Sequence, residues 1–132
     1  DLKKDADGFT YKGLSFLFGG GKFKFGQNNN ADGVKATRFQ YGGTGSTSKQ
    51  CVSFTVDVPG TLVVEAVSSS SSADRPLAVS VDDTELTSQN ALGSGAIRLT
   101  FDCSSATDGS KISIYSKNGG INVFSITWTP SK

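Results

Sequence analysis

Residues 111–129, KISIYSKNGGINVFSITWT, carry the clearest fold signal in this chain of 132 residues. Ile112 and Ile114 alternate with more polar residues, which is the period-two pattern of a strand with one buried face. An Asn-Gly pair at positions 118–119 is a strong hairpin signal, and a second apolar run follows at 121–128. This segment therefore predicts a hairpin that closes an all-β domain.

The same alternation recurs along the rest of the chain, with no helical period between the segments. Apolar residues alternate in the segments 9–18, 23–25, 52–58, 62–67, 77–81 and 97–103, and the segments 34–41 and 84–86 are interpreted as further strands. Pro59-Gly60 predicts a tight turn that makes a β-hairpin of the segments on either side of it. Short strands separated by turn residues at this spacing predict an antiparallel β-sandwich of the jelly-roll type with about 8–10 strands.

Length and charge limit the function classes. A chain of 132 residues suits one domain over 1–132, with the charged residues 1–8 linker-like. Thirteen basic and twelve acidic residues give a formal charge of +1, which does not favour nucleic-acid binding. Since no apolar run is long enough for a membrane span, we expect no membrane partner. The serine-rich, methionine-free composition favours a secreted, extracellular protein.

The chain has two cysteines, Cys51 and Cys103. A disulfide between them would close a long loop and stabilise the fold by roughly 4 kcal/mol in the chain-entropy model. Two buried free thiols fit the sequence equally well. The sequence leaves both states open.

Catalytic chemistry has little support in the sequence. The chain has no histidine, which excludes Ser-His-Asp and Cys-His catalysis. A carboxylate pair could still act on glycosidic bonds, but the candidates Asp57, Glu65, Asp82 and Asp83 are typical of solvated strands and turns. We therefore expect that the chain is not an enzyme.

Calcium stays open as a cofactor. Its oxygen ligands need no distinctive spacing outside EF-hands, and Asp5, Asp7, residues 28–30 and Asp32 supply such oxygens. A solvated loop explains the same residues more simply, so the sequence assigns no metal ligands.

A binding surface is the better candidate. Arg38 lies near Tyr41 in one predicted strand, Arg75 follows a serine run, and Lys117 lies in the predicted closing turn. A guanidinium fork suits carboxylates and hydroxyls, and an aromatic ring can stack on a sugar face. We predict that Arg38, Tyr41, Arg75 and Lys117 bind a polar ligand at one end of the sandwich. Pairing of the arginines with aspartates is the structural alternative.

The segment 34–128 resembles a β-sandwich module appended to secreted polysaccharide-degrading enzymes of gut and rumen bacteria, particularly pectate lyases. The resemblance is carried by the Arg38 strand, the glycine loop 42–45, the PGT sequence at 59–61, the Arg-Pro-Leu sequence at 75–77 and the terminal segment 115–126. These motifs are structural more than chemical.

The resemblance implies a non-catalytic carbohydrate-binding module that targets an appended catalytic domain to plant cell-wall polysaccharide. The basic residues favour pectic, uronate-bearing chains. A structural or adhesion-type spacer without a sugar ligand is the alternative, and a small glycosidase or lyase is a third, weaker one. The sequence leaves open whether a ligand would bind at the loop end or on a sheet face, where Phe39 or Tyr115 could contribute.

Overall fold

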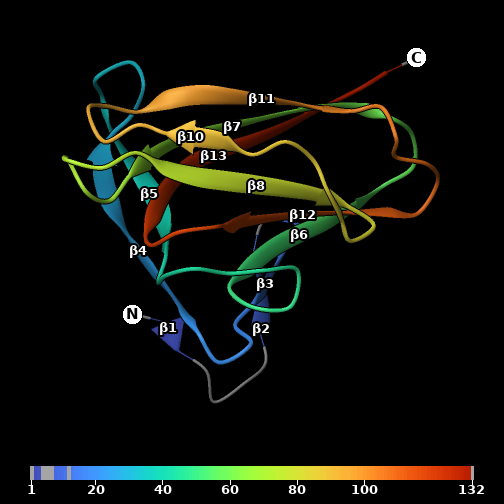
Figure 1. The fold of residues 1–132 in the computed structure, drawn as a ribbon, viewed down its shortest axis with the longest axis horizontal. Helices are drawn as coiled ribbons and strands as arrows, with labels where there is room; N and C mark the ends of the chain where they lie inside the picture. Colours follow the sequence, from blue (N-terminus) through green and yellow to red (C-terminus); the bar gives the residue numbers. More distant parts are fainter. Residues whose placement is uncertain (1, 4–7, 12, 132) are drawn as a thin grey trace.

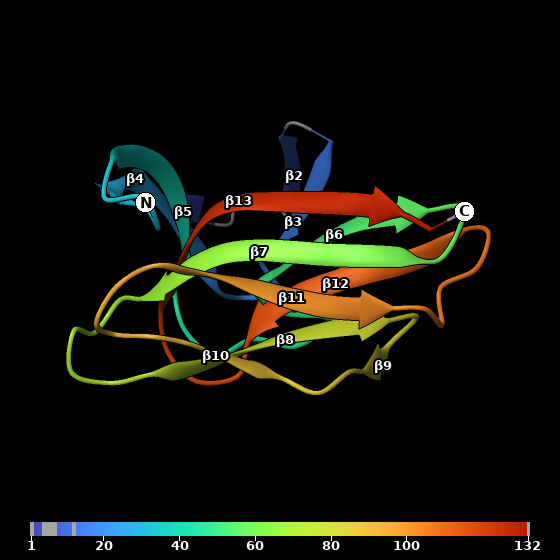
Figure 2. The same ribbon diagram turned by 90° about the horizontal axis from the view of Figure 1, so that it is seen from above.

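The computed structural model, which describes residues 2–3, 8–11 and 13–131, is a sandwich of two antiparallel β-sheets (Figures 1 and 2). Sheet A has six strands in the order β1 (Leu2–Lys3), β4 (Lys22–Asn29), β5 (Lys35–Tyr41), β13 (Ile121–Pro130), β7 (Gly60–Ser68) and β11 (Ile97–Cys103). Sheet B has seven, in the order β10 (Gln89–Ala91), β8 (Arg75–Val81), β12 (Ser110–Ser116), β6 (Cys51–Val56), β3 (Leu14–Leu17) and β2 (Gly8–Tyr11), with β9 (Thr84–Glu85) paired to β8. The predicted antiparallel β-sandwich is confirmed.

The core lies between the sheets and follows the predicted alternation. Each central strand places every second residue inward, and the side chains that meet between the sheets are almost fully buried. They include Leu62, Val64 and Ala66 of β7, Leu77 and Val79 of β8, and Ile112 and Ile114 of β12. The alternating segments of the sequence therefore mark the inner faces of both sheets.

The two predicted hairpins are wrong, although the strands on either side of each turn exist. β12 pairs with β6 and β8 in sheet B, whereas β13 pairs with β5 and β7 in sheet A. Likewise β6 belongs to sheet B and β7 to sheet A. Both turns are arches that carry the chain from one sheet to the other. A turn motif limits the local backbone, but burial of both flanking strands decides which strands pair.

The arch between β12 and β13 has hydrogen bonds to both sheets. The Lys117 amide donates to the Pro76 carbonyl at 2.9 Å beside sheet B, and the Ser69 amide donates to the Gly120 carbonyl at 3.1 Å at the end of β7. Gly119 has φ = 73°, a conformation that favours glycine. The Asn-Gly pair therefore marks a turn of the backbone, but only Gly119 of the two has a positive φ, and the flanking strands do not pair.

Three further differences concern strand extents. β4 extends well beyond the predicted segment 23–25, through residue 29, because it pairs with the whole of β5. β10 lies between the predicted segments 84–86 and 97–103. Of the linker-like segment 1–8, Leu2–Lys3 form β1 and Gly8 begins β2, and the other residues lie outside the described part. Short strands of this kind raise the count above the expected 8–10.

Cys51 and Cys103 are buried free thiols, so the disulfide alternative is wrong. Cys51 packs with Ala78 and Tyr115, whereas Cys103 belongs to the main core between the sheets. Burial raises the pKa of both thiols, that of Cys103 to about 11. Both are therefore protonated near neutral pH.

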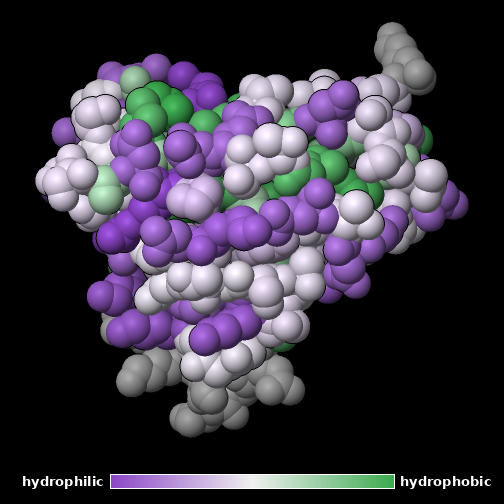
Figure 3. Space-filling view, viewed as in Figure 1, coloured by the Kyte–Doolittle hydropathy of each residue, from purple (hydrophilic) through white to green (hydrophobic). Residues whose placement is uncertain are grey.

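Figure 3 shows a face that is mostly hydrophilic or neutral, with apolar atoms reaching the surface in small areas. Among the described residues, no helix has the length and apolar character that a membrane span needs.

We predict that Tyr41→Phe destabilises the fold. The Tyr41 hydroxyl donates to the Ile114 carbonyl at 2.6 Å, joining β5 of one sheet to β12 of the other inside the core. Its loss should lower the free energy of unfolding by about 0.5–1.5 kcal/mol in urea titrations. Thr129→Val, which removes an exposed hydroxyl of β13, should change it by less than about 0.5 kcal/mol. Equal effects of the two variants would refute the inter-sheet role.

Candidate functional site

A cleft opens where sheet A divides. β13 pairs with β5 at only two positions, Asn122↔Gln40 and Val123↔Phe39, and a bulge then follows between Val123 and Ser125. Beyond the bulge β13 continues along β7, while β5 continues along β4. Figure 2 shows β4 and β5 turning away from β13, with β2 and β3 rising beside it. The backbone thus leaves an opening between two halves of one sheet.

The cleft has a volume of about 350 Å³ and is lined mainly by apolar side chains. Residues from β2, β3, β4, β5 and β13 contribute: Tyr11, Leu14, Phe16, Phe25, Thr37, Arg38, Phe39, Val123, Phe124, Ser125 and Ile126. An apolar cavity with a few polar groups is the usual form of a small-ligand site. This cleft is the best-formed candidate in the described part of the chain.

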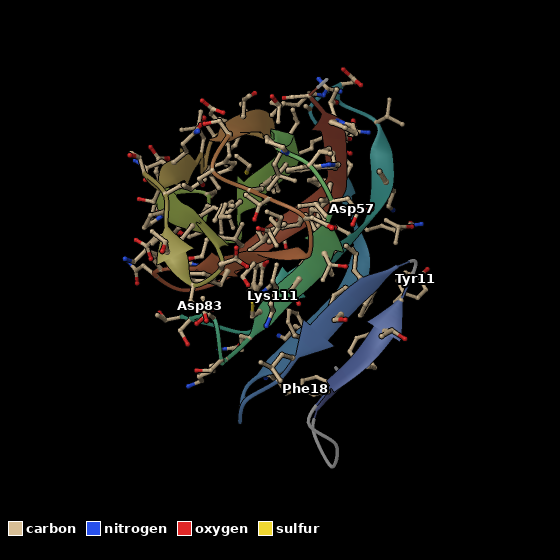
Figure 4. The ribbon with its side chains drawn as sticks, turned by 90° about the vertical axis from the view of Figure 1, so that its right-hand side faces the viewer. Tyr11, Phe18, Asp57, Asp83 and Lys111 are labelled. Atoms are coloured by element: carbon tan, nitrogen blue, oxygen red, sulfur yellow. The ribbon has the colours of Figure 1, made fainter. Side chains whose placement is uncertain are left out.

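Aromatic rings form the floor and one edge of the cleft. Phe16 packs edge-to-face on Phe39 at 5.2 Å between centroids, and the cluster continues outward to Phe25 and Tyr11. The rings of Phe25 and Tyr11 meet edge-to-face with 5.9 Å between their centroids. Phe25 is 40% exposed and Tyr11 is 48% exposed. Figure 4 shows Tyr11 at the end of the β2–β3 hairpin, on the side toward β5. Tyr11 and Phe25 therefore present ring surface that a ligand can cover.

Arg38 is the cation of the cleft. It lies opposite Gly26 on β4, where a side chain at position 26 would come 3.0 Å from Nη2, so the glycine makes room for the guanidinium. Nε donates to Asn28 Oδ1 at 2.7 Å, but Nη1 is buried with no hydrogen-bond partner in the described residues. Burial lowers the pKa of Arg38, although a guanidinium stays charged at neutral pH.

An unpaired buried N–H group of a cation is costly, and it marks a position where a ligand oxygen or a water would stabilise the structure. Arg38 is thus the one residue of the predicted set that lies in the cleft. That Arg38 contacts a ligand stays a prediction, and the structure places this residue in the lining of the cleft.

Tyr41 was predicted as a stacking surface, and its burial corrects this prediction. Its side chain is completely buried, because Tyr41 shares the inward face of β5 with Phe39. Burial raises the pKa of Tyr41 well above its usual value, and the hydroxyl donates to Ile114 across the core. No sugar can stack on this ring in this conformation.

Arg75 lies at the arch between β12 and β13. Its Nη1 donates to Ser69 Oγ at 2.7 Å and to the Gly120 carbonyl at 3.0 Å. A side chain at Gly119 would come 2.9 Å from Arg75 Cζ, so the guanidinium packs directly on the arch. These contacts tie the connection between the sheets to the end of β7 and give Arg75 a structural role.

Lys117 has its own ionic partner on sheet B. Its Nζ lies 2.8 Å from Glu85 Oε2, and the Tyr115 hydroxyl donates to Glu85 Oε1 at 2.8 Å. The hydrogen bonds from Lys117 and Tyr115 hold the pKa of Glu85 below its usual value. Arg38, on sheet A, has none of these partners. No described hydrogen bond or ion pair therefore joins the three predicted basic residues, and each contacts a different partner.

The acidic candidates are also engaged in structural contacts. Glu65 accepts from the Ala31 amide at 2.7 Å and from Ser125 Oγ, and Asp82 accepts from Ser110 Oγ and the Lys111 amide. The hydrogen bond from Ser110 is the main cause that holds the pKa of Asp82 below its usual value. These contacts stabilise loops and do not form a facing carboxylate pair.

The oxygens suggested for calcium have other partners. Asn28 accepts from Arg38, Asn30 accepts from the Asp32 and Val34 amides, and Asp32 pairs with Arg98 at 3.1 Å. Asp5 and Asp7 lie outside the described residues. Within the described ones, no group of three or more His, Cys, Asp or Glu could hold a metal ion.

Sequence reasoning missed Tyr11 and Phe25 as site residues. Both belong to alternating aromatic segments, which predict core positions, and the neighbouring rings are indeed buried. The two are exposed because they lie where the sheets separate, and one sequence gives no signal for that separation.

Comparison with solved structures supports the fold. The chain superposes on the CBM22-1–GH10 modules of Clostridium thermocellum endo-1,4-beta-D-xylanase 10B, complexed with xylohexaose, with TM-score 0.64 and 12% identity over 91% of this chain and 26% of that one. It superposes on the CBM22-1 xylan-binding domain of Paenibacillus barcinonensis Xyn10C with TM-score 0.57 and 12% identity, over 93% and 90% of the two chains. No family model and no curated protein matches the sequence.

We predict that Arg75→Ala lowers stability and leaves sugar binding intact. Loss of two hydrogen bonds from a charged donor should reduce the free energy of unfolding by roughly 2 kcal/mol. Urea titration measures the loss, with Lys35→Ala, which removes an exposed basic side chain of β5, as the control. A variant with unchanged stability and abolished binding would instead make Arg75 a ligand contact.

We predict that Glu85→Gln is destabilising at pH 7 by roughly 0.2–1 kcal/mol, the range for exposed ion pairs. Because the folded-state pKa of Glu85 is depressed, its contribution is present above the unfolded pKa of about 4.3 and is lost as pH falls through the lower folded value. Urea titrations from pH 7 to pH 3 should show the two proteins converging. A difference that stays constant with pH, or an equal pH dependence for Asp108→Asn, would contradict this assignment.

Proposed function

We propose that this chain is a non-catalytic carbohydrate-binding module that holds an appended catalytic domain near plant cell-wall polysaccharide. The observation that carries the proposal is the cleft in sheet A. It brings two exposed aromatic rings, Tyr11 and Phe25, next to an arginine with an unpartnered N–H group. This combination suits a ligand with an apolar ring face and polar substituents.

Each part of the cleft has a role in this mechanism. The rings of Tyr11 and Phe25 pack against the C–H face of a sugar, which releases water from both surfaces. The Arg38 guanidinium offers planar donors to hydroxyl or carboxylate oxygens, and the burial of its Nη1 atom strengthens a hydrogen bond formed there. Thr37 and Ser125 add hydroxyl groups at the edge.

The solved structures support the proposal by analogy of fold. The first contains a CBM22-1 module beside a GH10 module with xylohexaose, and the second is a xylan-binding domain. An appended enzyme, a polysaccharide ligand and an extracellular location are all consistent with that architecture. Fold alone does not determine a ligand, so the chemistry of the cleft must choose it.

We propose a uronate-bearing, pectic chain as the ligand, with neutral xylan as the competing one. Arg75 and Lys117 no longer contribute to this preference, because they donate to neighbouring residues. The preference now depends on the charge of Arg38, which would be stabilised more by a carboxylate than by a hydroxyl. An isolated site of this size binds weakly and gains from attachment to an enzyme acting on the same polymer.

A structural spacer without a ligand is the second candidate. Arg75 and Lys117, two of the residues predicted to bind a ligand, instead form contacts within the protein, and this favours the spacer. The two candidates differ in one observable, the retention of the isolated domain by a polysaccharide.

We expect affinity electrophoresis to show retardation by homogalacturonan more than by xylan, glucomannan or β-glucan. Arg38→Gln and Tyr11→Ala should each weaken binding at least tenfold, about 1.4 kcal/mol. Arg98→Gln is the matched control, because this exposed arginine lies on the same sheet and pairs with Asp32 outside the cleft.

Retention by xylan alone would keep the carbohydrate-binding function and refute the uronate preference. Unchanged mobility on every polysaccharide would support the spacer. Binding that survives both cleft variants would place the sugar elsewhere on the molecule.

A further inference from the structure

The outer face of sheet B carries a row of hydroxyl groups that the cleft does not use. Thr10 lies opposite Ser15, Ser15 opposite Ser53, Ser53 opposite Ser113, and Ser113 opposite Ser80. The row therefore crosses β2, β3, β6, β12 and β8 at one register level. It lies on the face away from the core, because the residues next to it in each strand, such as Phe16, Val52 and Ile114, are buried between the sheets.

The hydroxyl row is buried at its β8 end and exposed to solvent at its β2 end. At the β8 end, the Tyr115 hydroxyl reaches Ser80 Oγ at 2.8 Å, and Ser80 and Ser113 are buried. At the β2 end, Thr10 and Ser15 are exposed and line a groove of about 730 Å³. Leu17 of β3, Thr55 of β6 and Lys111 of β12 also line the groove.

Two side chains in the groove lack partners. Ser53 is 8% exposed and lines the groove, and its hydroxyl has no hydrogen bond to any described residue; it reaches the groove surface and is not among the fully buried atoms that lack a partner. The Lys111 ammonium likewise forms no ion pair with the described residues, in contrast to Lys117. A hydroxyl and an ammonium group that face the same groove without protein partners are available to hydrogen-bond a ligand or water there.

We propose that this groove is a second carbohydrate-binding site and takes a carboxylate-bearing sugar chain. Hydroxyl groups of Thr10, Ser15 and Ser53 can donate to and accept from sugar hydroxyls, and Lys111 supplies the charge complementary to a uronate. Neutral sugars would leave that charge unused. The groove and the cleft lie on opposite faces of the β2–β3 hairpin, since Tyr11 and Leu14 line the cleft and Thr10 and Ser15 line the groove; Phe16 lines both.

Figure 4 shows Lys111 beside β6 and β3, away from Tyr11 at the end of the hairpin. Two sites on one module would let it hold two chain segments, or two parts of one chain, and would raise the apparent affinity for a polymer over that for an oligomer.

The test is titration of the isotope-labelled protein with hexagalacturonate, followed by amide chemical shifts, in an Arg38→Gln background that disables the cleft. We expect shifts of residues in β2, β3 and β6 that saturate with a single dissociation constant. Lys111→Gln should raise that constant at least fivefold, and Ser15→Phe, which fills the groove from an exposed position, should abolish the shifts. Fully methyl-esterified hexagalacturonate should bind at least fivefold more weakly.

Controls separate this site from general effects. Lys49→Gln removes an exposed lysine of a loop, and Thr127→Phe adds an exposed ring to sheet A, so both should leave the dissociation constant unchanged. Absence of shifts on β2, β3 and β6, or binding unaffected by Ser15→Phe, overturns the second site. Shifts confined to the groove in the protein with an intact Arg38 would instead refute the cleft and keep this proposal.

Discussion

The arrangement of this protein depends on the passage of the chain between the sheets at the arch between β12 and β13. Arg75 holds that arch by donating to Ser69 and to Gly120, so the end of β7, the start of β8 and the arch form one hydrogen-bonded unit. Because of this passage, β13 lies in sheet A between β5 and β7 rather than beside β12. A hairpin at the same place would have left sheet A without its central strand.

The central position of β13 also creates the cleft. A strand with a bulge twists away from one neighbour, and here β13 stays with β7 and leaves β5 after two paired positions. The aromatic cluster that fills the core elsewhere is then open at its end, where Phe25 and Tyr11 become accessible beside Arg38. The core and the cleft thus use the same cluster of rings, buried at one end and exposed at the other.

Much of the fold could be predicted from alternation alone, because burial of one sheet face imposes a period of two on every strand. The segments that form β6, β7, β8 and β11 are predicted with their inward residues correct, whereas for β5 the sequence predicts the strand but not its inward face. The candidate site was predicted less well. Arg38 lies in the cleft, but Tyr41 points inward, and Arg75 and Lys117 form contacts with neighbours that no local pattern indicates. A charged residue near a turn is equally compatible with a ligand contact and with a structural one.

The sequence by itself determined that this is an all-β chain without histidine chemistry, which residues of most strands face the core, and where the backbone turns. Those properties depend on residues that are close together in the chain, so the amino-acid sequence alone indicates them. Tertiary structure decided which strands pair, that two apparent hairpins are arches, and that Tyr11, Phe25 and Arg38 meet. It also aligned the hydroxyls of Thr10, Ser15 and Ser53 in one row. These outcomes depend on contacts between residues far apart in the chain, and the requirement that both sheets bury their apolar faces together selects among them.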